Sequence, residues 1–137
     1  MGSLRRTPRN QPAGTLSESG VEPLPPQVAA RELHNPLRST PLVLRKGRAL
    51  FQTYCTPCHG DDARGDGPVR FLLRVPPADL THGMPVSLSD GYIYSTIRGG
   101  NQAMPPYGDT MSSNGTWAVV VYIRELQRKA NASASSR

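Results

Sequence analysis

The sequence predicts a small all-α domain of three to five helices, and two observations carry this prediction. Three separate segments, residues 41–54, 90–99 and about 112–129, repeat their apolar side chains at helical spacing. The chain between them is rich in glycine, proline and aspartate, which favour turns and extended backbone. We therefore expect the helices to supply the core and the intervening segments to supply loops.

The first predicted helix starts at Thr40 and Pro41, an N-cap hydroxyl followed by a proline at the first helical position. Basic residues lie mostly on one face. The other face carries Val43, Gly47, Leu50, Phe51 and Tyr54. Glycine inside a helix costs about 1 kcal/mol relative to alanine, so Gly47 indicates a place where another backbone or a ring comes close. The helix ends by presenting Cys55.

Two further helices are predicted downstream. Ser89 and Asp90 cap a short helix that ends at Arg98, Gly99 and Gly100. Its apolar residues are Tyr92, Ile93, Tyr94 and Ile97. The last helix begins near residues 112–114 and has basic residues near its C-terminus, where positive charge suits the helix dipole. It carries Trp117, Val120, Val121, Tyr122, Ile123 and Leu126.

Length and composition indicate one domain with two flanking segments. The first 40 of the 137 residues contain six prolines and no aromatic residue, so we expect residues 1–39 to form an extended proline-rich arm. The globular domain is expected at residues 40–129, with a disordered tail at 130–137. A domain of this size is marginally stable alone, which favours a large apolar cofactor at its centre.

The net charge of +6 favours acidic partners. It divides into +2 for residues 1–40, with five Arg against three Glu, and +4 for the remainder, with eleven Lys and Arg against seven Asp and Glu. Nucleic acid is not expected as a partner, because no recognition motif or stacking platform accompanies the basic residues. The sequence contains no run of 18 apolar residues, so we expect no transmembrane segment, and residues 1–10 lack the apolar stretch of a secretory signal.

The strongest functional motif is Cys55-Thr56-Pro57-Cys58-His59, a C-x-x-C-H sequence typical of covalent attachment of c-type haem. Each thiol can add to one vinyl group of the porphyrin, and His59 is placed to ligate the iron. A zinc site would need more ligands, but Cys55 and Cys58 are the only cysteines of the chain. A thioredoxin-like pair would need a βαβ context, and a plain disulfide leaves His59 unexplained. We therefore predict one covalently attached haem c.

The second axial ligand of the iron decides the function. Met104 lies 45 residues after His59, in a loop stiffened by Pro105 and Pro106, and we predict that its thioether fills this position. The competing residues are Met84, Met111, His82 and His34. His82 and Met84 precede the middle helix, which has to wrap the porphyrin edge, and Met111 is expected to fill a gap in the core. With two protein ligands, iron can change oxidation state but cannot easily bind oxygen or peroxide.

Residues 60–80 are predicted to form turns followed by extended chain. The segment 60–68 lacks the acidic spacing and the closing glutamate of a calcium loop. Pro76 and Pro77 impose extended backbone, and a carbonyl near either proline is expected to accept a hydrogen bond from the other ring nitrogen of His59. Arg98 is predicted to face a haem propionate, or alternatively to be a solvated arginine at a helix end.

Together these residues resemble a class I c-type cytochrome over residues 40–129. The motifs that carry the resemblance are the helix before Cys55–His59, Gly65–Pro68, Pro76–Leu80, the short helix, Met104–Tyr107 and the aromatic last helix. In that family the first and last helices cross at right angles, which implies that Gly47 and Phe51 meet Tyr122, with Trp117 nearby. The family also attaches its haem outside the bacterial cytoplasmic membrane.

More narrowly, residues 34–127 resemble the single-haem cytochrome subunit of bacterial alternative complex III, a quinol-oxidising membrane assembly. The motifs shared with that subunit are Asn35-Pro36, Ser89–Tyr94, Ile97-Arg98, Met104–Gly108 and Trp117–Arg124. A proline-rich arm before Asn35 would suit docking along neighbouring subunits. The subunit family usually has a charged pair before the tryptophan, where this chain has Asn114-Gly115-Thr116.

The resemblance implies an electron-transfer protein rather than an enzyme. It would pass electrons between a quinol-oxidising respiratory or photosynthetic complex and a downstream acceptor, as a subunit of that complex. Its location would be periplasmic, on the outer face of the cytoplasmic membrane, with other redox proteins as partners. Three alternatives stay open: a free periplasmic cytochrome c, a haem enzyme or sensor in which Met104 is displaced, and a structural subunit whose haem never turns over.

Overall fold

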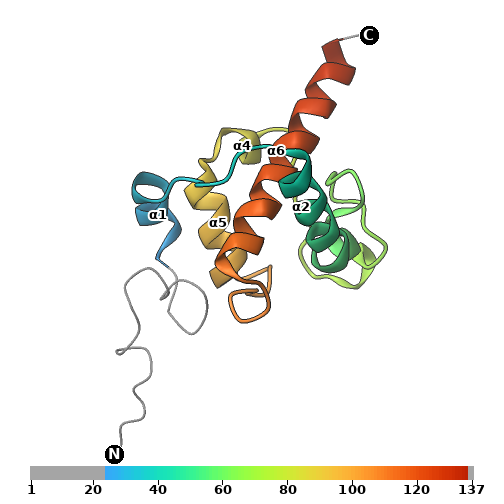
Figure 1. Ribbon diagram of the computed structural model, residues 1–137. Helices are drawn as coiled ribbons and strands as arrows, with labels where there is room; N and C mark the ends of the chain where they lie inside the picture. The colour runs from blue at the N-terminus through green and yellow to red at the C-terminus, as the bar shows by residue number, and fades with distance from the viewer. Residues whose placement is uncertain (1–23, 136–137) are drawn as a thin grey trace, which may run out of the picture.

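The computed structural model describes residues 24–135, and within this range the chain is helical with no strand. The elements are α1 (Pro26–Glu32), α2 (Pro41–Tyr54), α3 (Thr56–His59), the 3-10 turn η3 (Arg70–Leu72), α4 (Met84–Ser87), α5 (Asp90–Gly99) and α6 (Ser113–Ser135). Figure 1 shows α6 running through the middle of the molecule, with α2 on one side and α5 on the other. The all-α prediction is confirmed, and α1 and the single-turn helices α3 and α4 were not foreseen.

Local capping explains where the two predicted inner helices begin. The Thr40 hydroxyl accepts the N–H of Val43 at 3.2 Å, and the Ser89 hydroxyl accepts the N–H of Tyr92 at 3.2 Å. Both bonds satisfy a donor that the first turn of a helix otherwise leaves unpaired. The predicted starts of α2 and α5 are therefore correct to the residue.

α2 crosses α6 at Gly47, and this contact forms one side of the core. A side chain at Gly47 would run into the carbonyl oxygen of Ala118 and lie 3.0 Å from the Cβ of Tyr122. One turn further along α2, the rings of Phe51 and Tyr122 pack at 5.4 Å between centroids and 59° between planes. The close approach expected at Gly47 is therefore present. Trp117 takes no part in this contact and instead stacks on Tyr94 of α5, at 3.9 Å and 17°.

The segment of residues 24–39 before α2 folds onto the domain, which corrects the prediction of an extended arm for these residues. α1 packs on α5, where Ala29 is fully buried and its carbonyl occupies the space that a side chain at Gly91 would need. The Ser95 hydroxyl donates to the carbonyl of Leu24, and the side-chain amide of Asn35 donates to the carbonyl of Trp117 at 3.1 Å. A seven-residue helix that buries one small side chain has no apolar stripe to reveal it. The part of the arm at residues 1–23 lies outside the described residues.

α6 is also longer than predicted, because it continues to Ser135. Residues 130–135 read Ala-Asn-Ala-Ser-Ala-Ser, so every second residue is alanine. Alanine has the highest helix propensity of all residues. The predicted disordered tail at 130–137 is therefore wrong for residues 130–135, and residues 136–137 lie outside the described range.

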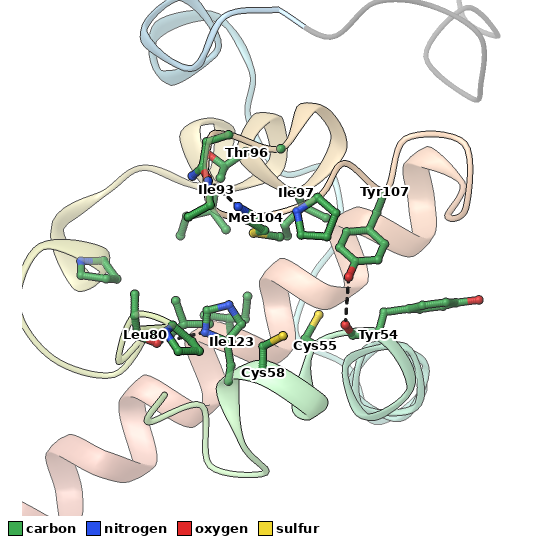
Figure 2. A pocket seen from close by; sticks show the side chains of 18 of the residues that line it. Tyr54, Cys55, Cys58, Leu80, Ile93, Thr96, Ile97, Met104, Tyr107 and Ile123 are labelled. Atoms are coloured by element: carbon green, nitrogen blue, oxygen red, sulfur yellow. Dashed lines mark hydrogen bonds between the residues drawn. The ribbon is translucent and has the colours of Figure 1, made fainter. Parts of the chain in front are cut away.

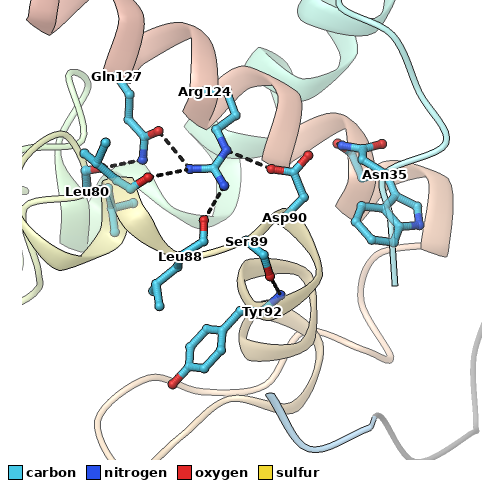
Figure 3. Close-up of polar contacts among 10 residues, drawn as sticks. Asn35, Leu80, Leu88, Ser89, Asp90, Tyr92, Arg124 and Gln127 are labelled. Carbon is cyan, nitrogen blue, oxygen red and sulfur yellow. Dashed lines mark hydrogen bonds and ion pairs between the residues drawn. The ribbon is translucent and has the colours of Figure 1, made fainter. Parts of the chain in front are cut away.

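Arg124 ties α6 to the links on either side of α4 (Figure 3). Its guanidinium donates to the carboxylate of Asp90 at 2.8 Å, to the carbonyl of Leu88, and to the side-chain oxygen of Gln127 at 3.0 Å. The amide of Gln127 donates in turn to the carbonyl of Leu80 at 2.8 Å. Charge-assisted bonds of this kind are about twice as strong as neutral ones. They hold the chain around α4 in place beside the last helix.

Candidate functional site

A cavity of about 530 Å³ lies between the α2–α3 corner and α5 with the loop that follows it. Its walls are mostly apolar, and Phe51, Leu80, Ile93, Ile97 and Ile123 are among the lining residues. The volume falls within the range of about 300–1,000 Å³ that is typical of cofactor and ligand sites. Figure 2 shows Cys55 and Cys58 on one side of this space and Met104 on the other.

The two cysteines lie at the junction of two helices. Cys55 ends α2 and caps α3, and its carbonyl accepts the N–H groups of Cys58 at 3.2 Å and His59 at 2.8 Å. This single tight turn brings the three side chains of the motif to one wall of the cavity. The thiols are not joined to each other.

The environment of Cys55 does not suit a redox-active dithiol. Burial, with a further contribution from the neighbouring Cys58, raises the pKa of the Cys55 thiol to about 12. Catalytic C-x-x-C thiols instead have a pKa well below the usual value, because the thiolate is the reactive form. The apolar wall around Cys55 therefore argues against the thioredoxin-like interpretation.

His59 is held by one ring nitrogen and presents the other. Its Nδ1 donates to the carbonyl of Ala78 at 2.9 Å, so Nε2 is the nitrogen left to bind a metal. Burial lowers the pKa of His59, and the hydrogen bond to Ala78 partly opposes this effect. Because the net shift is downward, the imidazole is neutral at neutral pH. The predicted acceptor was a carbonyl near Pro76 or Pro77. Both prolines line the cavity, and the acceptor is the carbonyl of Ala78, directly after Pro77, so the expected acceptor near these prolines is present.

Met104 lines the opposite wall, and its backbone is bonded on both sides to Asn101. The side-chain oxygen of Asn101 accepts the N–H of Met104 at 2.8 Å, and the N–H of Asn101 donates to the carbonyl of Met104 at 2.9 Å. Gly100 makes this turn possible, because its φ of 68° suits glycine and a side chain there would lie 2.6 Å from the Met104 carbonyl. The loop is therefore preformed around Met104.

None of the competing axial candidates lines the cavity. Met111 is buried in the core, as expected, and Met84 is 72% exposed on α4. His82 is exposed and its ring bonds Thr81 and Asp79, and His34 is exposed near α1. Of the histidines and methionines in residues 24–135, His59 and Met104 alone reach the cavity.

Arg98 is not among the residues that line the cavity, and its role toward a haem propionate stays a prediction, whereas the alternative of a solvated arginine is wrong. Its side chain is only 6% exposed. Nη1 donates to the carbonyl of Met111 at 3.0 Å and to the hydroxyl of Thr116 at 3.1 Å, and Nη2 donates to the carbonyl of Gly108 at 3.1 Å. Arg98 therefore binds the chain that follows the Met104 loop.

Two further contributions were not predicted from the sequence. The Tyr107 hydroxyl donates to the carbonyl of Tyr54 at 3.3 Å, and the two rings lie 5.8 Å apart, so the Met104 loop is linked to the end of α2 (Figure 2). The other is the cap that the Asn101 side chain forms on the Met104 turn. The sequence signal for it was an asparagine three residues before Met104, a residue type that often forms Asx turns.

The residues around this cavity fit a haem. The space is large and apolar, a thiol pair and a neutral imidazole lie on one wall, and a thioether lies on the facing wall. These are the donors that bind haem iron and the side chains that attach a porphyrin covalently. By contrast, residues 24–135 contain no group of three or more His, Cys, Asp and Glu side chains of the kind that a zinc site requires.

The helical fold and this cavity define a class I c-type cytochrome. The chain belongs to the family described as cytochrome C oxidase, cbb3-type, subunit III, whose model matches residues 43–123. Membership in this cytochrome c family implies covalently bound haem c and a role in electron transfer.

One solved structure with a similar fold is a chain of the Kuenenia stuttgartiensis reducing HAO-like protein complex Kustc0457/Kustc0458, at 26% sequence identity and a TM-score of 0.59. The match covers 66% of this chain and 46% of the other, so the chain spans about half the length of that relative. No curated protein matches the chain. None of the helices in residues 24–135 is long and apolar enough to cross a membrane.

Proposed function

We propose that the chain is a single-haem electron carrier, attached to its haem through Cys55 and Cys58, with His59 and Met104 as the axial ligands of the iron. The observation that carries this proposal is the position of Met104 on the wall opposite the C-x-x-C-H turn, across one cavity. The haem supplies reversible one-electron oxidation and reduction of its iron.

The protein residues provide a site that changes little between redox states. The Ala78 carbonyl orients the imidazole of His59, and the Asn101 turn holds the backbone of Met104. Apolar side chains on the remaining walls limit the access of water. A second axial ligand from the protein favours outer-sphere electron transfer over the binding of oxygen or peroxide.

The partners are other redox proteins, and we place the chain in a quinol-oxidising membrane complex on the outer face of the bacterial cytoplasmic membrane. Three observations support this assignment. The sequence resembles the single-haem subunit of alternative complex III, the similar Kuenenia structure is described as a protein complex, and the net charge of +6 favours acidic partners. Electrons would pass from that complex to a downstream acceptor.

The test starts with full-length protein produced with its haem-attachment machinery. The intact mass should equal the chain plus one haem, and the reduced protein should show the absorption bands of a c-type haem. The oxidised protein should show the far-red band of methionine bound to ferric iron. A purified chain that binds zinc, or that has no haem, would overturn the carrier assignment.

The partner assignment needs a separate measurement. Stopped-flow mixing with a purified quinol-oxidising complex and quinol should reduce the haem rapidly, and the rate should fall with ionic strength because the encounter is between opposite charges. A haem that keeps both axial ligands but is not reduced by the complex would refute this partner and leave a free periplasmic carrier. A wild-type protein without the far-red band would instead indicate an enzyme or sensor.

A further inference from the structure

Two large apolar side chains stand in solvent on the η3 turn. Phe71 is 79% exposed and Leu72 is 82% exposed, the two highest values among the large apolar residues that the structure describes. Phenylalanine and leucine are usually buried, and neighbouring exposed apolar side chains commonly mark a contact with another molecule. We therefore expect this turn to contact another molecule.

A haem in the cavity does not cover this pair. The next residues along the chain, Leu73 and Val75, line the cavity and would contact its occupant. Phe71 and Leu72 are outside the lining set, on the solvent side of the same segment. The tip formed by these two residues thus lies at the rim of the haem site and remains exposed after the cofactor is bound.

The tip is held in shape by the protein beneath it. The N–H of Val69 donates to the carbonyl of Pro57 at 3.0 Å, which anchors the turn to the haem-binding helix α3. Arg70 donates to the carbonyl of Asp66 at 2.9 Å, and its guanidinium lies 4.1 Å from the centre of the Phe71 ring. The exposed ring is therefore fixed in an outward position, which lowers the entropy cost of binding through it.

The charges of the segment are positive on both sides of the tip. Between Asp66 and Asp79 the sequence contains Arg70 and Arg74 and no acidic residue. The tip is a protruding turn rather than a hollow, and a protrusion with apolar side chains between arginines fits a soft, anionic surface. A bilayer with acidic headgroups has these properties, since it accepts apolar side chains at the acyl boundary and attracts arginine at the phosphates.

We propose that the segment Arg70–Arg74 docks the protein on an anionic lipid bilayer, with Phe71 and Leu72 inserted at the boundary between headgroups and acyl chains. Arg70 and Arg74 then lie at the level of the lipid phosphates. Because the tip borders the cavity, docking turns the rim of the haem site toward the membrane. This inference goes beyond the proposed electron transfer and does not depend on which ligands the iron has.

The experiment is flotation of the full-length, haem-loaded chain with vesicles of phosphatidylcholine, alone or mixed with phosphatidylglycerol. Wild type should float with the phosphatidylglycerol vesicles and remain largely unbound to phosphatidylcholine alone, and added salt should weaken the binding. The double variant Phe71→Ser, Leu72→Ser should lose binding affinity by at least about tenfold, since it loses two inserted apolar side chains.

Two matched variants separate insertion from general effects. Leu42→Ser removes an apolar side chain that is 69% exposed at the start of α2, away from the cavity, and should bind like wild type. The exchange Phe71→Leu, Leu72→Phe keeps the apolar tip and should also retain binding. All variants should show the wild-type haem spectrum, which reports an intact domain.

The proposal is overturned if wild type does not float with phosphatidylglycerol vesicles, or if the double serine variant floats as well as wild type. It is also overturned if the serine variant binds vesicles normally but loses reduction by a protein partner, because the tip would then be a protein contact. The spectral tests of the electron carrier are independent of all these outcomes.

Discussion

Arg98 and Gly108 are joined by two hydrogen bonds, and each residue is the donor in one of them. The N–H of Gly108 donates to the backbone carbonyl of Arg98 at 3.0 Å, and Nη2 of Arg98 donates to the carbonyl of Gly108 at 3.1 Å. The chain between them is the loop that carries Met104. The guanidinium also binds Met111 and Thr116, so one buried arginine joins both ends of this loop to α6. Arg98 is therefore a positioning residue for the Met104 loop, although it does not touch the cavity.

The first prediction concerns Arg98→Lys. A lysine keeps the charge, but its compact ammonium cannot reach three acceptors in the geometry of a guanidinium fork. Each buried acceptor left without its donor costs about 1–3 kcal/mol. We expect a lower free energy of unfolding, a weaker far-red methionine band, and faster binding of carbon monoxide to the reduced protein as the Met104 loop loosens.

The matched control is Arg128→Gln, which removes an exposed arginine paired with Glu125 on α6. This variant should keep the band and the carbon monoxide rate of wild type, because exposed ion pairs contribute little to stability. A stable Arg98→Lys protein with an unchanged band and rate would show that Arg98 does not position the loop.

The second prediction concerns Met104→Ala. Removing the thioether should abolish the far-red band and open one axial position of the iron, so peroxidase activity should rise. Met111→Leu is the control, since Met111 is a buried core residue outside the cavity and leucine preserves its size. If Met104→Ala keeps the band while Met111→Leu loses it, the assignment of the axial ligand is incorrect.

The parts of the site that were predicted from the sequence are those that depend on side-chain chemistry and local pattern. Cys55, Cys58 and His59 form a contiguous motif, and the two prolines directly after Met104 indicated a stiff loop suited to an axial ligand. The starts of α2 and α5 were predictable because a cap involves residues only a few positions apart.

The parts that were missed depend on which segments meet in space. The acceptor for His59 was predicted only as a carbonyl near Pro76 or Pro77, and the packing of this segment decides that it is the carbonyl of Ala78, directly after Pro77. Arg98 has the same identity whether it is solvated at a helix end or buried under a loop, and only the packing of residues 108–116 decides between the two. α1 was missed because its stability comes from contact with Gly91 on α5 and not from its own amphipathicity.

The third prediction concerns Gly47→Ala at the crossing of α2 and α6. Alanine is the better helix former by about 1 kcal/mol, so an isolated helix would gain stability. In the folded protein the new methyl group would collide with the carbonyl of Ala118, and overpacking of this kind costs about 1–3 kcal/mol. We expect a net loss of stability in denaturant unfolding, whereas Lys46→Ala on the exposed face should change it little. A Gly47→Ala protein more stable than wild type would show that the helices separate at no cost.

The last prediction concerns the pH dependence that Asp79 contributes, beside the carbonyl that orients His59. Burial tends to raise the pKa of Asp79, but hydrogen bonds from the backbone and hydroxyl of Thr81, at 2.8 and 2.6 Å, and from His82 lower it below the ordinary value of 3.8. A carboxylate with a lowered pKa in the folded state stabilises the protein above its unfolded pKa, and this stabilisation is lost as pH falls through the folded pKa. Asp79→Asn should therefore be less stable than wild type at neutral pH, and the difference in free energy of unfolding should shrink below about pH 4. Denaturant unfolding of both proteins across this range measures the difference. A gap that stays constant down to strongly acidic pH would mean that the Asp79 charge contributes nothing to the fold.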